Sequence, residues 1–168
     1  MIPRVSYWWI LAAVLLPSCS HYRLGVPAEP DFGSVHIESV VNDSNAPQVQ
    51  ALLTRNLIAA FLRDGTVRVG SRDSAAATLR VVVSGYGRTR SATRSNDTVL
   101  ARSYNLNLSA EITLLNNHSG QPYFENRPIT AIETAYVDDG LPQAEYEAMP
   151  ALAIRLADRI KDAVIGVW

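Results

Sequence analysis

The sequence predicts an α+β fold: a two-layer α/β sandwich with two amphipathic helices packed on one face of a four- to five-stranded mixed sheet. Apolar and polar residues alternate strictly from Tyr104 to Leu114, which is typical of a strand with one buried face. Two other segments, 49–61 and 152–164, repeat apolar residues every three or four positions, as amphipathic helices do. Because a half-buried sheet needs a covering layer, we expect the helices to supply it.

The first strand is expected from Ser34 to Val41, where Val35 and Ile37 alternate with His36 and Glu38. A helix should follow, with Asn45 and Gln48 spaced as in a capping box. Its apolar stripe consists of Val49, Leu52, Leu53, Leu57, Ala60 and Phe61. Asp64-Gly65 predicts a left-handed helix end, and residues 66–69 a short strand. The strand, helix, strand order favours parallel pairing through a crossover.

Period-two alternation then predicts a meander of three longer strands. The first begins at Ala77 and continues to Arg90, and Gly85 and Gly87 indicate a bulge or bend within it. Residues 91–98 and 116–120 are polar turns, and the strand that returns over 122–137 should be irregular at Pro128. The chain should close on a helix whose main part begins with Pro150 as its first helical residue, after a short helical turn.

The N-terminus has the order of a secretory signal: one basic residue, Arg4, the apolar run from Val5 to Leu16, and then Pro17-Ser18 before Cys19. This run is shorter than the ~20 residues that cross a bilayer as a helix. Leu16-Pro17-Ser18-Cys19 looks like a lipobox, and Cys19 is the only cysteine of the chain. We therefore expect residues 1–18 to be a cleaved signal peptide and Cys19 to carry the lipid. A thioether-linked diacylglycerol with an added N-acyl chain would anchor it stably to a membrane.

Residues 19–33, with Pro27, Pro30 and Gly33, are expected to form a lipidated tether, and residues 34–168 a single α/β domain. The chain has 15 Lys and Arg against 16 Asp and Glu, a net charge of −1, and loss of Arg4 with the signal peptide makes it −2. No basic excess is available to bind nucleic acid phosphates. A single cysteine also excludes disulfides within the chain and cysteine-based metal sites.

The sequence predicts no enzyme, no cofactor and no metal site. The G-x-S-x-G elbow of serine hydrolases is missing, and His21, His36 and His118 lack the spacing of a helical metal pair. Strand carboxylates, Glu111, Glu125 and Glu133, could form an acid/base pair, but solvated sheet-face residues are the more common case. We therefore name no catalytic residue.

One cluster suggests a ligand site. Arg88, Arg90, Arg94 and Arg102 lie around the first hairpin of the meander, and a two-residue step puts Arg88 and Arg90 on one strand face. Their guanidinium groups could bind phosphates or carboxylates. The alternative is a charged hairpin tip that discourages edge-to-edge aggregation.

The order of these segments resembles the LptE family of outer-membrane lipoproteins. The resemblance begins with Cys19, the following His21-Tyr22-Arg23-Leu24-Gly25 and a strand, and continues with the helical segment Leu52 to Gly65 (LLTRNLIAAFLRDG). After these come residues 66–69, the segment Ala75 to Leu79 that leads into the next strand, the first hairpin of the meander and the closing helix. The resemblance covers nearly all of the mature chain.

The resemblance implies a non-enzymatic plug and assembly partner of the LptD β-barrel in the transport and insertion of lipopolysaccharide. The protein would then lie at the periplasmic face of the outer membrane, held there by its lipid, with Ser20 compatible with release to that membrane. The arginines would meet the phosphates of lipopolysaccharide. A different class, an adaptor or activator of another envelope machine such as a peptidoglycan synthase, also combines a lipid anchor with a small α/β domain. A lipid-anchored hydrolase is disfavoured by the missing nucleophile.

Overall fold

A computed structural model describes residues 30–91, 103–136 and 141–166 of the chain. The strands β1 (Ser34–Ile37) and β2 (Val41–Asn42) are followed by helix α2 (Val49–Asp64) and the short strand β3 (Arg68–Val69). Three long strands come next, β4 (Ala77–Arg90), β5 (Ser103–Asn116) and β6 (Pro122–Tyr136), before the long helix α3 (Leu141–Ile165). The expected signal peptide, Cys19 and most of the tether lie outside the described residues.

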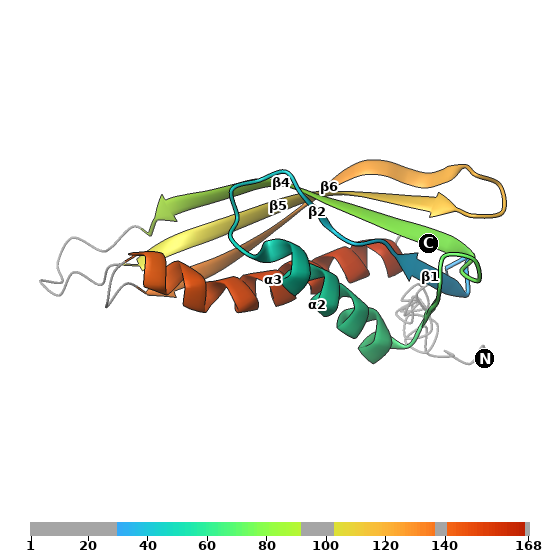
Figure 1. The fold of residues 1–168 in the computed structure, drawn as a ribbon, viewed down its shortest axis with the longest axis horizontal. Helices are drawn as coiled ribbons and strands as arrows, with labels where there is room; N and C mark the ends of the chain where they lie inside the picture. The colour runs from blue at the N-terminus through green and yellow to red at the C-terminus, as the bar shows by residue number, and fades with distance from the viewer. Residues whose placement is uncertain (1–29, 92–102, 137–140, 167–168) are drawn as a thin grey trace, which may run out of the picture.

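The strands form one mixed sheet in the order β3-β1-β4-β5-β6, with β2 also paired to β4. β1 runs parallel to β3 and β4, and β4, β5 and β6 form the expected antiparallel meander. Both helices lie on the same side of this sheet (Figure 1). The predicted two-layer α+β sandwich is therefore confirmed.

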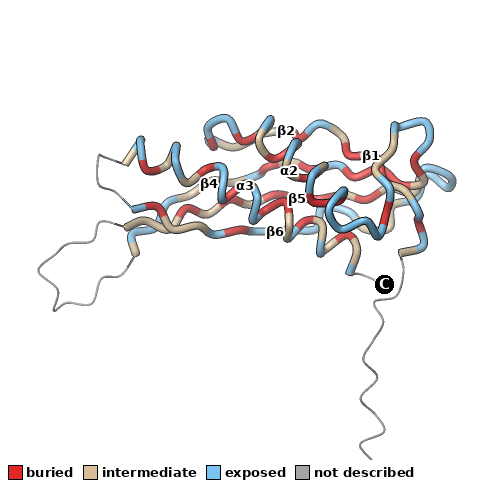
Figure 2. The backbone as a smooth tube through the Cα atoms, turned by 90° about the horizontal axis from the view of Figure 1, so that it is seen from below, coloured by how far each residue is buried: buried red, intermediate tan, exposed pale blue. Residues whose placement is uncertain are grey.

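The core lies between the sheet and the helices, along the red segments of Figure 2. The alternation of β5 is realised as predicted, because every second residue from Leu106 to Leu114 is buried. Fully buried large side chains come from both layers: Phe32, Leu53, Leu57, Phe61, Leu79, Leu106, Leu108, Ile112, Leu114, Leu152, Leu156 and Ile160. Burying one such aliphatic or phenyl side chain contributes about 1.5–3 kcal/mol, so this interface dominates the stability of the fold.

The beginning of α2 differs from the expected capping box. Gln48 is the N-cap residue, in the left-handed region with φ 54, and no side chain caps the helix. The preceding turn is instead ordered by Asn42, whose carbonyl oxygen Oδ1 accepts hydrogen bonds from the backbone N–H and the hydroxyl of Ser44. Its Nδ2 donates to the carbonyl of Ala46 at 3.0 Å. Because this Asx turn carries the chain through residues 43–46, Asn45 is displaced from the capping position.

The end of α2 is as predicted. Gly65 has φ 75, and its N–H donates to the carbonyl of Phe61 at 3.1 Å, which closes the helix. Near this end α2 is tied to α3 by Arg63 to Asp158 at 3.0 Å and Lys161 to Asp64 at 3.3 Å.

The start of α3 differs from the prediction for the C-terminal segment. Instead of beginning at Pro150, the helix runs continuously from Leu141 to Ile165 with Pro150 inside it. Proline removes one N–H and leaves the carbonyl four residues earlier, that of Tyr146, without its helical partner. Pro150 is exposed and Tyr146 is 61% exposed, so that carbonyl lies on the solvent side, where water satisfies it at low cost.

Helix α3 is held against the last strand by three arginines. Arg155 pairs with Glu133 of β6 at 2.6 Å, and Arg159 donates to the carbonyl of Thr130 at 2.6 Å. Arg127 of β6 donates in turn to the carbonyl of Ala163. These contacts occupy polar groups along β6, which forms one edge of the sheet, and they orient α3 over β5 and β6. Within the described residues, no helix has the length and apolar character needed to span a membrane.

A candidate ligand site at the end of the first hairpin

A β-bulge in β4 decides where the predicted arginines point. The register with β5 shifts between Val83 and Gly85, so Ser84 is an extra residue in the ladder. Upstream of it Val83 lies opposite Ala110 on the buried face, and downstream Tyr86 lies opposite the buried Leu108. The bulge expected at these glycines is confirmed. Because side chains alternate with a period of two, the extra residue turns Tyr86, Arg88 and Arg90 toward the helix side.

Arg88 meets the first part of α3. Its Nη1 atom lies 2.9 Å from Oε1 of Glu145, and the side chains are 49% and 13% exposed, respectively. The carboxylate is therefore largely enclosed while the guanidinium keeps part of its surface in water. An arginine can make up to five N–H contacts, so this pairing leaves donors of Arg88 for a second anion.

Tyr86 adds a third polar group to this cluster. Its hydroxyl oxygen is buried, as is Oε1 of Glu145. Burial of the hydroxyl, followed by the nearby charge of Glu145, raises the pKa of Tyr86 to about 12. The phenol is therefore neutral at any physiological pH and can donate a hydrogen bond.

The four arginines predicted as a ligand site have different positions. Arg88 and Arg90 lie two residues apart on one face of β4, and Arg90 is opposite Tyr104 of β5. Arg90 is exposed, and no ion pair of its side chain occurs among the described residues. Arg94 and Arg102 lie outside the described residues, so the site consists here of Tyr86, Arg88, Arg90 and Glu145, which we call the arginine site.

The other titratable residues that the sequence singled out do not gather into a site. Glu133 pairs with Arg155, and the ring Nδ1 of His36 lies 3.2 Å from the carbonyl oxygen of Gly70. Among the described residues, no three His, Cys, Asp or Glu side chains come together as metal ligands would.

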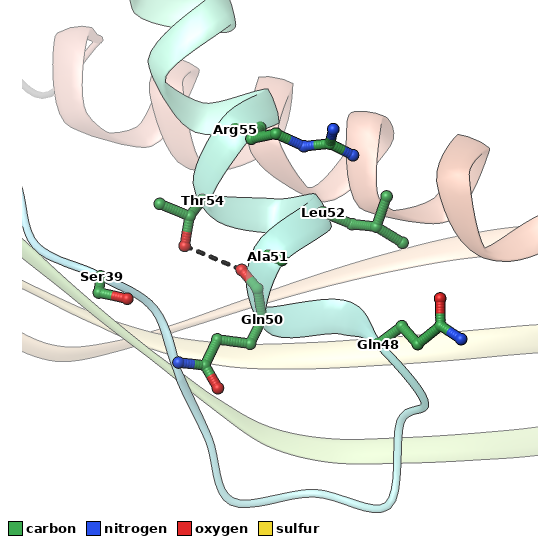
Figure 3. Close-up of a pocket in the computed structure, with 7 residues that line it drawn as sticks. All are labelled: Ser39, Gln48, Gln50, Ala51, Leu52, Thr54 and Arg55. Atoms are coloured by element: carbon green, nitrogen blue, oxygen red, sulfur yellow. Dashed lines mark hydrogen bonds between the residues drawn. The ribbon is translucent and has the colours of Figure 1, made fainter.

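A hollow of about 680 Å³ runs along α2 (Figure 3). Gln48, Leu52 and Arg55 project from one side of the helix, and Gln50 and Thr54 lie toward Ser39 on the other side. The seven lining residues include neither a carboxylate nor a histidine. This surface therefore lacks the pair of groups that acid/base chemistry needs.

The sheet face opposite the helices carries a patch without charge, which we call the uncharged sheet face. By their register, its members are Gly85, Gly87 and Thr89 of β4, Ser103, Asn105, Asn107 and Ser109 of β5, and Thr130, Ile132, Thr134 and Tyr136 of β6. Cross-strand hydrogen bonds tie it together: Ser109 to Thr130 at 3.0 Å, Thr134 to Asn105 at 3.1 Å and Asn107 to Thr89 at 3.4 Å. Ile132 and Tyr136 are 50% and 69% exposed. Removing such a face from water costs less than removing a charged one.

Comparison with known proteins places the chain in a family. The sequence model of LptE, described as lipopolysaccharide-assembly, matches residues 32–164. The chain belongs to the LptE family. The match covers every described strand, α2 and α3 as far as residue 164, so the resemblance to the LptE family is confirmed for these segments. Cys19 and residues 21–25 precede the matched range. A comparison with curated protein sequences gave no match.

Solved structures share this architecture at low sequence identity. A hypothetical protein of Chlamydia trachomatis is 12% identical with a TM-score of 0.54, covering 79% of this chain and 95% of that one. A Xanthomonas campestris protein is 13% identical with a TM-score of 0.54, covering 80% and 85%. A minor lipoprotein of Acinetobacter baumannii is 18% identical with a TM-score of 0.52, covering 79% and 90%. These likenesses support the fold.

Two members of the arginine site, Tyr86 and Glu145, could not be predicted from the sequence of this LptE-family chain. Tyr86 was not singled out because its orientation depends on the bulge, and Glu145 because it lies in a helix far along the chain. The sequence carries one usable signal, the glycines 85 and 87, which indicated a bulge or bend in this part of β4 but not that Ser84 is the extra residue. Nothing in the sequence pairs Arg88 with Glu145.

Proposed function

We propose that this LptE-family protein is a non-enzymatic lipoprotein of the outer membrane, anchored at its periplasmic face by lipid on Cys19. It acts there as plug and assembly partner of an LptD-like β-barrel in the transport and insertion of lipopolysaccharide. The observation that carries the proposal is the family match over residues 32–164, almost the whole described body. The lipobox around Cys19 supplies the anchor.

The uncharged sheet face supports the plug role physically. The lumen of a large outer-membrane barrel is lined by polar residues, since the lipid-facing and lumen-facing positions of its strands alternate. Hydroxyl and amide side chains such as Asn107 and Thr130 can exchange hydrogen bonds with such a wall without burying an unpaired charge. We therefore assign the uncharged sheet face to contact with the barrel.

The arginine site supports contact with lipopolysaccharide itself. Lipopolysaccharide carries clustered phosphates, and guanidinium groups bind phosphate through paired N–H donors. Arg88 and Arg90 share one face, with Arg94 and Arg102 in the adjoining part of the chain. We propose all four as phosphate contacts.

The proposal is tested by photocrosslinking in the native membrane. A crosslinking residue placed at Asn107 should capture a large β-barrel, whereas the same residue at Leu62 of α2, which is 64% exposed on the helix layer, should capture much less. Replacing Cys19 with Ser should release the protein from the membrane and lower capture at both positions. Capture of a peptidoglycan synthase with no barrel would instead support the adaptor class.

A further inference from the structure

We propose that Glu145 is the specificity-determining residue of the arginine site: its carboxylate occupies Arg88 in the free protein, and an incoming phosphate must compete with it. This inference rests on the proposed function, because it concerns the same arginines. It goes further in assigning a role to a residue of α3 that neither the sequence motifs nor the family match single out.

The geometry of the pair supports this role. Glu145 Oε1 is 2.9 Å from Arg88 Nη1, and the carboxylate is the more enclosed partner, with 13% of its side chain exposed against 49% for Arg88. The guanidinium is thus reachable from solvent on one side and neutralised on the other. A weakly charged anion gains little at an arginine that already has a counter-ion, whereas a dianionic phosphate gains more.

Tyr86 strengthens the competition. Its hydroxyl is buried beside Glu145, and it lies on the same strand face as Arg88 and Arg90. As a neutral phenol it is a hydrogen-bond donor for whichever anion occupies the site, either the carboxylate or a phosphate oxygen. Arg90, two residues further along β4, has no ion pair among the described residues and provides the first point of contact. The order of engagement is therefore Arg90 first and Arg88 after release from Glu145.

The site selects by charge and not by shape. With Glu145 in place, a single carboxylate or sulfate ester must replace one ion pair by another of similar strength, so its net gain is small. A ligand with clustered phosphates can bind Arg90 and displace Glu145 at the same time, because the two contacts are made by one molecule. We infer that Glu145 makes the arginine site selective for multiply phosphorylated lipid over singly charged amphiphiles.

The test compares Glu145→Gln with Glu133→Gln in the full lipidated protein in detergent, with lipopolysaccharide and dephosphorylated lipopolysaccharide as the probes. Glu133 is a matched control, because it pairs with Arg155 of α3 at 2.6 Å and is 19% exposed. Both substitutions raise the net charge by one unit, so a general gain in attraction for anions is common to both. Glu145→Gln should raise the affinity for lipopolysaccharide by about two- to fivefold over Glu133→Gln.

Two further measurements identify how this gain in affinity arises. In the double variant Arg88→Gln, Glu145→Gln the gain should disappear, since it depends on a freed Arg88. Dephosphorylated lipopolysaccharide, which can reach Arg88 only through single carboxylates, should gain more from Glu145→Gln, relative to Glu133→Gln, than lipopolysaccharide does, because without Glu145 a singly charged group no longer has to replace an existing ion pair. An equal or smaller gain contradicts the selectivity assigned to Glu145. Thermal denaturation of each variant confirms that the fold is retained.

The outcomes separate this inference from the proposed function. If Arg88→Gln and Arg90→Gln weaken binding but Glu145→Gln behaves like Glu133→Gln, the role of Glu145 is wrong and the arginine site stands. A gain that persists in the double variant also overturns the inference. If neither arginine variant changes binding, the site itself is wrong, and the barrel partnership is then judged by crosslinking alone.

Discussion

At the scale of single residues, Tyr86 shows how the fold changes the chemistry of a side chain. On a regular strand the side chain of Tyr86 would lie on the sheet face opposite the helices. The bulge turns it toward the helix layer, beside Glu145. Burial of the hydroxyl is the largest cause of its raised pKa, about 12, and the charge of Glu145 is the next. Arg88 lowers the same pKa, but by less.

This raised pKa predicts a pH dependence of stability. Above pH 10 the tyrosine of the unfolded chain ionises while Tyr86 of the folded chain keeps its proton up to about 12, so its contribution is complete below 10 and is lost between these values. The difference in unfolding free energy between the wild type and Tyr86→Phe should therefore shift against the wild type as the pH rises through this window. Denaturant unfolding of both proteins across this pH window measures the difference in unfolding free energy.

The exposed Tyr136, 69% accessible, provides the control for this measurement. Tyr136→Phe should follow the wild type over the same pH range. A difference between wild type and Tyr86→Phe that stays constant from below pH 10 to about pH 12 would contradict a buried phenol beside a carboxylate.

At the scale of secondary-structure elements, α2 is defined more sharply at its end than at its beginning. Its start lacks a side-chain cap and depends on the Asx turn at Asn42, whereas its end has a glycine in the left-handed region. The space around Gly65 is open, with no atom within 4 Å of an added Cβ. A larger residue there is opposed by the backbone conformation alone.

Gly65→Ala should therefore destabilise the protein by about 1–2 kcal/mol, the cost of placing an L-residue in the left-handed region. Gly33→Ala is a matched control: its surroundings are equally open, and Gly33 does not have a positive φ. We expect Gly33→Ala to leave the stability unchanged within about 0.5 kcal/mol. Equal effects of the two substitutions, measured by denaturant unfolding, would argue against the αL end of α2.

At the scale of the whole molecule, the two sides of the sheet carry different surfaces. The helix side holds the core and the arginine site, and the far side presents the uncharged sheet face. The chain as a whole has 15 Lys and Arg and 16 Asp and Glu, and the exposed Glu111 follows Ser109 on the same side of β5, so the absence of charge is a property of this patch alone. Such a face suits a partner that supplies hydrogen-bonding groups, as the lumen of a barrel does.

A charge on this face should prevent assembly with the barrel. Ile132→Glu puts a carboxylate beside Asn107, where the proposed interface would bury it without a partner, a cost of several kcal/mol. Recovery of the barrel with the tagged protein should fall at least tenfold. Leu62→Glu adds the same charge at an aliphatic residue of α2 that is 64% exposed, against 50% for Ile132, and should leave recovery near that of the wild type. Full recovery with Ile132→Glu would exclude this face from the interface.

The sequence by itself determined the elements and their layers. The period-two pattern of β5 and the helical stripes of α2 and α3 are local consequences of which residues must be buried, so the sandwich could be predicted from them. Gly65 ended α2 as predicted because only backbone conformation is involved there. The segment order of the family was equally readable, since it is a linear pattern. The signal peptide and the lipobox at Cys19 are linear patterns too, and they stay predictions.

Only the tertiary structure decided the rest. The position of the bulge set the face on which Tyr86, Arg88 and Arg90 lie, because one extra residue inverts the alternation of all that follow. Pro150 is tolerated inside α3 because the carbonyl of Tyr146, which loses its helical partner, lies on the solvent side, and the sequence does not state this orientation. Glu145 reached Arg88 through the packing of α3 on the sheet, which brings together residues with no local relation in the chain. The ion pair between Arg88 and Glu145 in the arginine site is therefore a product of the tertiary fold alone.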